Sequence, residues 1–185
     1  MIVIGIGANL PHAEYGPPRR TCGAALEMLQ TRGVRIKQRA TWYKTAPVVA
    51  NPDQQGEQPW YINGAAQIKT DLDAFALLSM LLDVETAFGR LRSIADAPRT
   101  LDLDIITFKG QILDRDGLNI PHPRMQERAF VLYPLHDLAP DWVHPIRGST
   151  ITEMIHALPT DQSFDSLEDS GGLYGTEWPG TENSR

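Results

Sequence analysis

The chain has few of the residues that would build a disulfide scaffold or a membrane span. Cys22 is the only cysteine among 185 residues, which excludes an intrachain disulfide and a thiolate metal cluster. The apolar start, residues 1–7, lacks a basic leader and is far too short to cross a bilayer. We therefore expect a reducing, cytoplasmic setting and no membrane partner.

Positive charge is also scarce. The chain has 17 Lys and Arg against 23 Asp and Glu, which gives a formal net charge of −6. Protein surfaces that bind nucleic acids are, in contrast, generally basic. The basic residues of the central region gather at Arg90, Arg92, Arg99, Lys109, Arg115, Arg124 and Arg128. This clustering favours a small anionic ligand over a nucleic acid. Oligomeric state has no marker in the sequence, and we expect a monomer.

The most informative stretch contains two closely spaced acids. Asp102 and Asp104 alternate with apolar residues over 101–105, the period of a strand with one buried face. Both carboxylates then emerge on the other face, where they repel unless a cation lies between them. Carboxylate oxygens suit Mg²⁺, and the planar guanidinium of Arg99, just before the strand, suits phosphate. The simpler alternative is a pair of acids on a solvated strand.

Hydrophobic periodicity and turn residues predict mixed strands and helices. Strands are expected at residues 1–7, 35–45, 60–69, around the two acids and, as a short return strand, at 111–113; helices are expected at 20–32, between 71 and 89, in part of 124–138 and at 150–158. Residues 46–59 form a long loop, which in a compact domain is often functional. This order predicts an α+β fold: a ferredoxin-like, antiparallel-rich sheet with helices packed on its faces.

One domain is expected, over residues 1–160. Residues 161–185 are acidic and rich in glycine, serine and threonine. We predict a flexible C-terminal tail there, although Trp178 could pack against the domain.

Several segments stand in the order, and near the spacing, of one known family. Residues 85–92 end the second long helix, Pro98-Arg-Thr-Leu-Asp-Leu-Asp104 follows, and Ile120-Pro-His-Pro-Arg-Met125 leads into residues 128–135. Together with residues 4–10 and 61–63, they make the chain resemble 6-hydroxymethyl-7,8-dihydropterin pyrophosphokinase of folate biosynthesis, from residue 1 to about 158. The resemblance implies transfer of the β,γ-pyrophosphoryl unit of ATP to the pterin hydroxymethyl oxygen, with release of AMP.

The resemblance also implies a set of site residues. Asp102 and Asp104 would hold two magnesium ions, and Arg90 and Arg99 would be the catalytic arginines that meet the phosphates. The implied ATP contacts are Glu85, Arg92, Ile105, His122 and Arg128, and the implied pterin contacts are Thr45, Ala46, Val48, Tyr61, Asn63 and Phe130. ATP is then the co-substrate, and hydroxymethyldihydropterin is the other small-molecule partner.

The residues taken alone leave simpler alternatives. Arg90 could be an arginine at a helix C-terminus, His122 a structural histidine, and Asn63, beside Gly64, part of a turn. For the whole chain, a nucleotidyl transferase or cyclase could use the same paired acids on a ferredoxin-like sheet and would release pyrophosphate. A non-catalytic nucleotide- or pterin-binding module is a third possibility, which loss of an acid or of Arg99 would favour; neither is lost.

Overall fold

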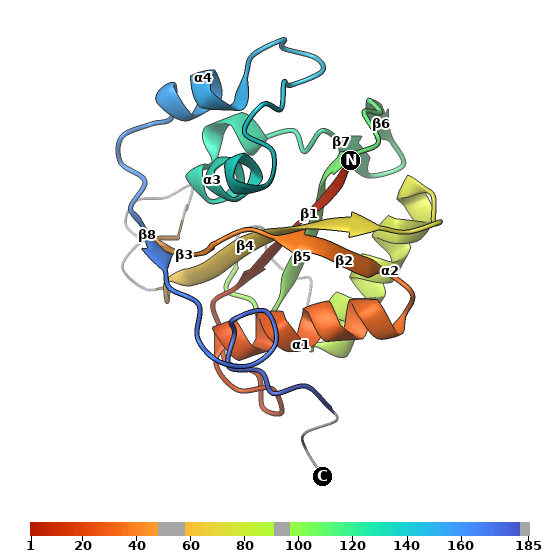
Figure 1. The fold of residues 1–185 in the computed structure, drawn as a ribbon, viewed down its shortest axis with the longest axis vertical. Helices are drawn as coiled ribbons and strands as arrows, with labels where there is room; N and C mark the ends of the chain where they lie inside the picture. Colours follow the sequence, from red (N-terminus) through yellow and green to blue (C-terminus); the bar gives the residue numbers. More distant parts are fainter. Residues whose placement is uncertain (48–57, 91–96, 182–185) are drawn as a thin grey trace.

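The computed structural model of the chain describes residues 1–47, 58–90 and 97–181 (Figure 1). The elements in chain order are β1 (Ile2–Ala8), α1 (Pro18–Thr31), β2 (Arg35–Arg39), β3 (Trp42–Thr45), β4 (Tyr61–Lys69), α2 (Ala74–Ala87), β5 (Asp102–Phe108), β6 (Leu113–Arg115), β7 (Leu118–Ile120), the 3₁₀ turn η2 (Met125–Glu127), α3 (Ala129–Leu138), α4 (Ile151–His156) and β8 (Phe164–Leu167). Within these residues no helix combines the length and the apolar character that crossing a membrane requires.

The main sheet is antiparallel throughout. Its strands follow one another as β5-β1-β4-β3-β8, and β2 also pairs with β4, alongside β3. When β2 and β3 are taken as one interrupted strand, β5, β1, β4 and β2/β3 take the fourth, first, third and second places of a ferredoxin-like β-α-β-β-α-β unit. The predicted α+β fold is confirmed. The continuous strand expected over 35–45 is instead two strands, interrupted at residues 40–41. The register against β4 changes across this interruption, from Arg39 opposite Ala66 to Tyr43 opposite Asn63.

Helices cover both faces of this sheet (Figure 1). Ile4 of β1 belongs to one buried core with Leu26 of α1 and Leu77 of α2. Its neighbour Val3 points to the other face, into a second core with residues of α3 and α4. The functional side chains described below lie on the α3 face, while the α1–α2 face is closed by apolar packing.

Residues 161–181 pack against the domain, which differs from the flexible tail expected from composition. β8 extends the sheet beyond β3. Trp178 is only 9% exposed, and its Nε1 donates to Glu27 of α1 at 2.6 Å. Asp169 accepts two hydrogen bonds from Arg39, at 2.6 and 2.7 Å. Composition counts acids and glycines, whereas a few well-placed aromatic and charged contacts hold this segment.

Candidate functional site

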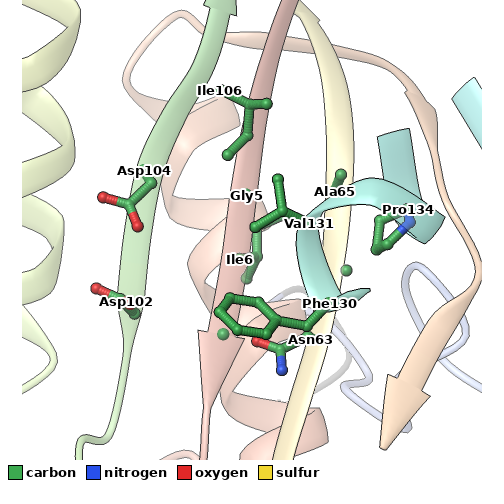
Figure 2. A pocket seen from close by; sticks show the side chains of 12 residues that line it. Gly5, Ile6, Asn63, Ala65, Asp102, Asp104, Ile106, Phe130, Val131 and Pro134 are labelled. Carbon is green, nitrogen blue, oxygen red and sulfur yellow. The ribbon is translucent and has the colours of Figure 1, made fainter. Parts of the chain in front are cut away.

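A pocket of about 360 Å³, open to solvent, lies on the α3 face of the sheet (Figure 2). It is lined by residues of β1, β4, β5 and α3, namely Gly5, Ile6, Gly7, Asn63, Gly64, Ala65, Asp102, Asp104, Ile106, Phe130, Val131 and Pro134. Figure 2 shows the two aspartates along β5 and, across β1, Asn63 and Phe130. The pocket therefore brings the predicted acids together with two of the predicted pterin contacts.

Two glycines keep the floor of the pocket clear. Gly7 pairs with Asp102 on one side and with Asn63 on the other. A Cβ atom at Gly7 would lie 2.6 Å from Asn63 Oδ1, whereas one at Gly5 would lie 3.2 Å from the end of the Ile106 side chain. The alternation of isoleucine and glycine in β1 thus buries one face of the strand and clears the other.

The strand predicted around the acids is confirmed as β5. Leu103 and Ile105 point into the α1–α2 core, and Asp102 and Asp104 are among the residues that line the pocket. Asp102, which is 24% exposed, accepts a hydrogen bond from Arg90 through Oδ1 and one from Arg99 through Oδ2 at 3.0 Å. The two predicted catalytic arginines are therefore held at one carboxylate at the mouth of the pocket.

Arg90 reaches this place because α2 ends in a tight, glycine-dependent turn. Gly89 has a φ of +72°, and the N–H of Arg90 donates back to the carbonyl of Glu85 at 3.0 Å. The N–H of Gly89 bonds the carbonyl of Thr86, which completes a Schellman motif. This turn directs the chain back toward β5, so Arg90 meets both Glu85 and Asp102.

Asp104 lies in an environment that disfavours its charge. Among the residues that the structure describes, no donor bonds its carboxylate, in contrast to Asp102. Burial raises the pKa of Asp104 to about 7, with further contributions from the negative charges of Asp102 and Glu85, while Arg90 and Arg128 act in the opposite direction. A cation beside Asp104 would remove this cost.

Asn9 is a site-forming residue that the sequence analysis quoted only as part of a motif. It is 2% exposed, and its Oδ1 accepts from the N–H of Arg99 at 2.7 Å. Its own N–H donates to the Arg99 carbonyl at 3.0 Å, and its side-chain nitrogen donates to the Pro59 carbonyl at 3.1 Å. Asn9 therefore fixes the main chain of Arg99 against the end of β1. An asparagine directly after a buried strand was the available signal.

Of the predicted pterin contacts, Asn63 and Phe130 line the pocket, whereas Thr45 and Tyr61 are not among its lining residues. The Asn63 amide nitrogen donates to the Thr45 hydroxyl at 2.8 Å, and both side chains are buried. The Phe130 ring lies 5.4 Å from the Arg128 guanidinium. Tyr61 lies under Arg99, with the guanidinium 5.8 Å from its ring. A buried amide next to an aromatic ring can hold a flat, polar heterocycle.

His122 is neutral near pH 7. Burial lowers its pKa to about 4, helped by the positive charges of Arg128 and Arg124. Its Nδ1 accepts from the main-chain N–H of Arg124 at 3.3 Å, so the neutral ring keeps Nε2–H as its donor. A neutral N–H donor beside two arginines can bond an anionic ligand, and binding then requires no change in the protonation of His122.

Three predicted residues stand apart from this group. The Ile105 side chain lies in the α1–α2 core, on the opposite face of the sheet from the pocket. Only its main chain faces a neighbouring strand at the pocket edge. Val48 and Arg92 lie outside the described residues.

The paired acids fit magnesium bound together with a polyphosphate. Magnesium is usually held by one or two carboxylates and substrate phosphates, not by a cage of protein ligands. In the described ranges no group of three or more His, Cys, Asp or Glu side chains is arranged to hold a metal. The two aspartates are therefore the donor set. A cation is favoured because burial disfavours the charged form of Asp104 and no donor in the described part of the chain bonds its carboxylate.

The site combines paired carboxylates, converging guanidinium groups and a polar aromatic recess on a ferredoxin-like sheet. This chemistry suits a nucleotide polyphosphate at one end and a ring compound at the other. The family model described as 7,8-dihydro-6-hydroxymethylpterin-pyrophosphokinase (HPPK) matches residues 3–140. The chain belongs to this family.

Curated relatives agree with this assignment, and a solved structure agrees with the fold. A 2-amino-4-hydroxy-6-hydroxymethyldihydropteridine pyrophosphokinase of Pseudomonas aeruginosa is 37% identical over 167 residues, covering 90% of this chain and 94% of the relative. The Synechocystis protein of the same name is 40% identical over 154 residues, covering 83% and 73%. The structure of wild-type Plasmodium falciparum HPPK-DHPS matches with a TM-score of 0.63 at 14% identity, covering 84% of this chain and 44% of that chain, and supports the fold alone.

Proposed function

We propose that the chain transfers the pyrophosphoryl group of ATP to the hydroxymethyl group of 6-hydroxymethyl-7,8-dihydropterin, in folate biosynthesis. Membership in the pyrophosphokinase family gives the reaction. The observation that carries the assignment to this chain's own residues is the convergence of Asp102, Asp104 and two arginines beside a recess containing Asn63. The paired acids and arginines supply the phosphate end, and the recess supplies the pterin end.

The pterin end consists of Thr45, Ala46, Tyr61, Asn63 and Phe130, with Val48 proposed from the sequence alone. The Thr45 hydroxyl occupies the Asn63 amide nitrogen, which orients the Asn63 Oδ1 as an acceptor for a ring N–H. Phe130 offers an aromatic face to the ring. A pterin with its polar edge unpaired in this recess would bind poorly, which is a source of specificity.

The phosphate end consists of the arginines and His122. We propose that Arg90 and Arg99 are catalytic and meet the phosphates as the pterin oxygen bonds to the β-phosphorus. The bond between the β-phosphorus and the α,β-bridging oxygen then breaks, and its electron pair stays on the oxygen that leaves with AMP. The hydroxyl proton of the pterin is released to solvent. Guanidinium groups remain charged and offer planar donors, so they stabilise charge that moves between phosphate oxygens.

Further ATP contacts are proposed for His122 and Arg128. Their electrostatic coupling to the acids supports this, since Arg128 lowers the pKa of Asp104 and Asp102 raises the pKa of His122. Glu85 is proposed to act through Arg90, since it is 1% exposed and bonds that guanidinium. Ile105 is proposed to contribute its main chain. Arg92 remains a proposal from the sequence.

Two magnesium ions are proposed at Asp102 and Asp104. Magnesium at this position neutralises polyphosphate charge and orients the oxygens. The absence of a donor to Asp104 among the described residues supports this proposal, as do the burial of Asp104 and the repulsion by Asp102 and Glu85, which together raise its pKa.

The remaining proposals concern the chain as a whole. We propose that residues 1–160, the range expected from the sequence, form the pyrophosphokinase domain and that residues 161–181 extend it, because β8 pairs with β3 and Trp178 packs in the α1–α2 core. A monomer is proposed from the sequence alone. The net charge of −6 and the single, buried Cys22 support a cytoplasmic protein that binds no nucleic acid.

The deciding experiment mixes the protein with ATP, Mg²⁺ and 6-hydroxymethyl-7,8-dihydropterin and follows the nucleotide product. AMP formed in equal amount to the pterin pyrophosphate supports the proposal, whereas ADP or free pyrophosphate contradicts it. Asp104→Ala is expected to abolish the magnesium-dependent turnover while circular dichroism shows an intact fold. Full activity in that variant would remove the metal assignment.

A further inference from the structure

A short segment at the start of β8 joins α3, which lines the pocket, to the end of β3, whose Thr45 hydroxyl accepts a hydrogen bond from the pocket residue Asn63. Residues 162–164 run from the start of α3 to the end of β3. Phe130 belongs to the first of these elements and Thr45 to the second. The composition of residues 161–185 predicted that this segment is part of a flexible tail.

Gln162 uses both ends of its side-chain amide on the residues that flank Arg128. Its Oε1 accepts from the N–H of Ala129 at 2.9 Å, and its Nε2 donates to the carbonyl of Glu127 at 2.8 Å. The Arg128 side chain makes no capping hydrogen bond to α3. Gln162 thus satisfies one of the N–H groups that every helix start leaves unpaired. Because it bonds the residues before and after Arg128, it restrains the main chain there.

The next two residues hold the end of β3. The Ser163 carbonyl accepts from the N–H of Ala46 at 3.0 Å, and Phe164 pairs with Thr45 in the β3–β8 ladder. The Phe164 ring lies 4.3 Å from the ring of Tyr133 on α3. Three consecutive residues therefore set the position of α3 relative to the end of β3.

The restrained residue lies at the reaction site. The Arg128 guanidinium lies 5.4 Å from the Phe130 ring. Its charge also lowers the pKa values of both Asp104 and His122, which places it near both groups. A change in the main chain at Arg128 would move the guanidinium relative to both ends of the pocket.

We propose that Gln162 is a positioning residue of the pyrophosphoryl transfer, which holds Arg128 and Phe130 where they meet the phosphates and the pterin. The inference rests on the roles proposed above for these two residues. It places a contributor to the site beyond residue 140, where the family model ends.

The test compares Gln162→Ala with Gln111→Ala, since Gln111 is an exposed glutamine of the turn after β5. Gln162→Ala is expected to raise KM for ATP roughly threefold to tenfold, the effect of losing one or two ordinary hydrogen bonds, with kcat within about twofold of the wild type. Gln111→Ala is expected to change neither parameter. An unchanged KM in Gln162→Ala overturns the proposal.

A double variant separates positioning from a general loss of structure. In an Arg128→Ala background, adding Gln162→Ala is expected to leave KM for ATP unchanged, because the residue through which Gln162 acts is gone. The same fold increase in both backgrounds overturns the proposal.

Hydrogen exchange at the Ala129 amide tests the contact without any turnover. This amide is expected to exchange about tenfold faster in Gln162→Ala than in Gln111→Ala, and equal rates overturn the proposal. If the wild type forms no AMP, the proposed function fails, while amide exchange and calorimetry with ATP still decide for or against Gln162.

Discussion

The carboxylate of Glu85 binds the guanidinium of Arg90 from within the helix that Arg90 follows. The same Oε1 atom accepts the main-chain N–H of Leu103 at 2.7 Å. Leu103 stands between Asp102 and Asp104, so one buried acid aligns a proposed catalytic arginine with the strand that carries both proposed metal ligands. Glu85 therefore both positions the Arg90 guanidinium and stabilises the packing of α2 on β5.

Replacing Glu85 is expected to weaken both. Glu85→Ala leaves the buried N–H of Leu103 without its acceptor, which costs about 2–3 kcal/mol of unfolding free energy, and it removes one of the two carboxylates that hold Arg90. Urea denaturation measures the first effect, and kcat/KM for ATP measures the second. Asp83→Ala, an exposed acid on the same helix, is the control and should change stability by less than about 0.5 kcal/mol. Equal losses in the two variants would argue against a positioning role for Glu85.

Sequence patterns predicted the central strands and the acid pair because these features follow from local rules. The alternation around Asp102 and Asp104 alone predicts which face they take, and β5 confirms it. The contacts of Asn9 with Arg99 and Pro59 join residues far apart in the chain, so no local pattern announces them. Glu85 was assigned to ATP through family resemblance. Its bond to Leu103 depends on how α2 packs on β5.

The C-terminal segment was misjudged for the same reason. Its acidic, glycine-rich composition is typical of a tail, and its strand β8 has a single aromatic residue, Phe164. What holds it are partners supplied by distant elements: Arg39 for Asp169, Glu27 for Trp178 and the edge of β3 for β8. Composition cannot reveal partners.

Asp104 is expected to make stability depend on pH in the metal-free protein. Its folded pKa of about 7 exceeds the ordinary value of 3.8, so the folded chain binds the proton more tightly than the unfolded chain. Its contribution is therefore fully present below about pH 4 and is lost as pH rises through 7. Between pH 4 and pH 8, the stability of Asp104→Asn relative to the wild type should rise by up to about 4 kcal/mol, since one pKa unit corresponds to about 1.4 kcal/mol. Thermal unfolding in EDTA from pH 4 to 8 measures the difference.

The control for this pH series is Asp114→Asn, which removes an exposed carboxylate from β6. It should track the wild type across the whole range. If the advantage of Asp104→Asn were as large at pH 4 as at pH 8, titration of the Asp104 carboxylate would not be its cause.

Asn63 is expected to control pterin affinity with little effect on ATP. Asn63→Ala removes the amide that pairs with Thr45 and lines the recess, so the pterin's polar edge loses a partner. The Kd for the pterin should rise about tenfold to a hundredfold, as measured by fluorescence titration. Gln67→Ala, on the same strand but outside the pocket lining, should leave that Kd unchanged. A large effect on ATP and none on the pterin would reverse our assignment of the two ends.

The two glycines of β1 should differ in how well they tolerate a methyl group. Gly7→Ala places Cβ 2.6 Å from Asn63 Oδ1, so Asn63 must move and pterin binding should weaken by about tenfold or more. Gly5→Ala meets only the end of the Ile106 side chain at 3.2 Å, which can turn aside, so its effect should be smaller. Calorimetric titration of both variants with the pterin gives the ranking, and the reverse order would contradict a floor kept clear for the ligand.

Trp178 tests whether residues 161–181 belong to the folded unit. Its ring packs in the α1–α2 core, edge-on to Tyr15 at 5.5 Å, and Nε1 bonds Glu27. Trp178→Ala should therefore lower the unfolding free energy by about 3 kcal/mol, as for other buried tryptophans. Trp60→Ala, at a site that is 40% exposed, should cost less than about 1 kcal/mol. Urea denaturation followed by circular dichroism compares them without relying on the fluorescence that each substitution removes. A Trp178→Ala protein as stable as the wild type would return this segment to the status of a tail, because a loosely attached aromatic has no packing to lose.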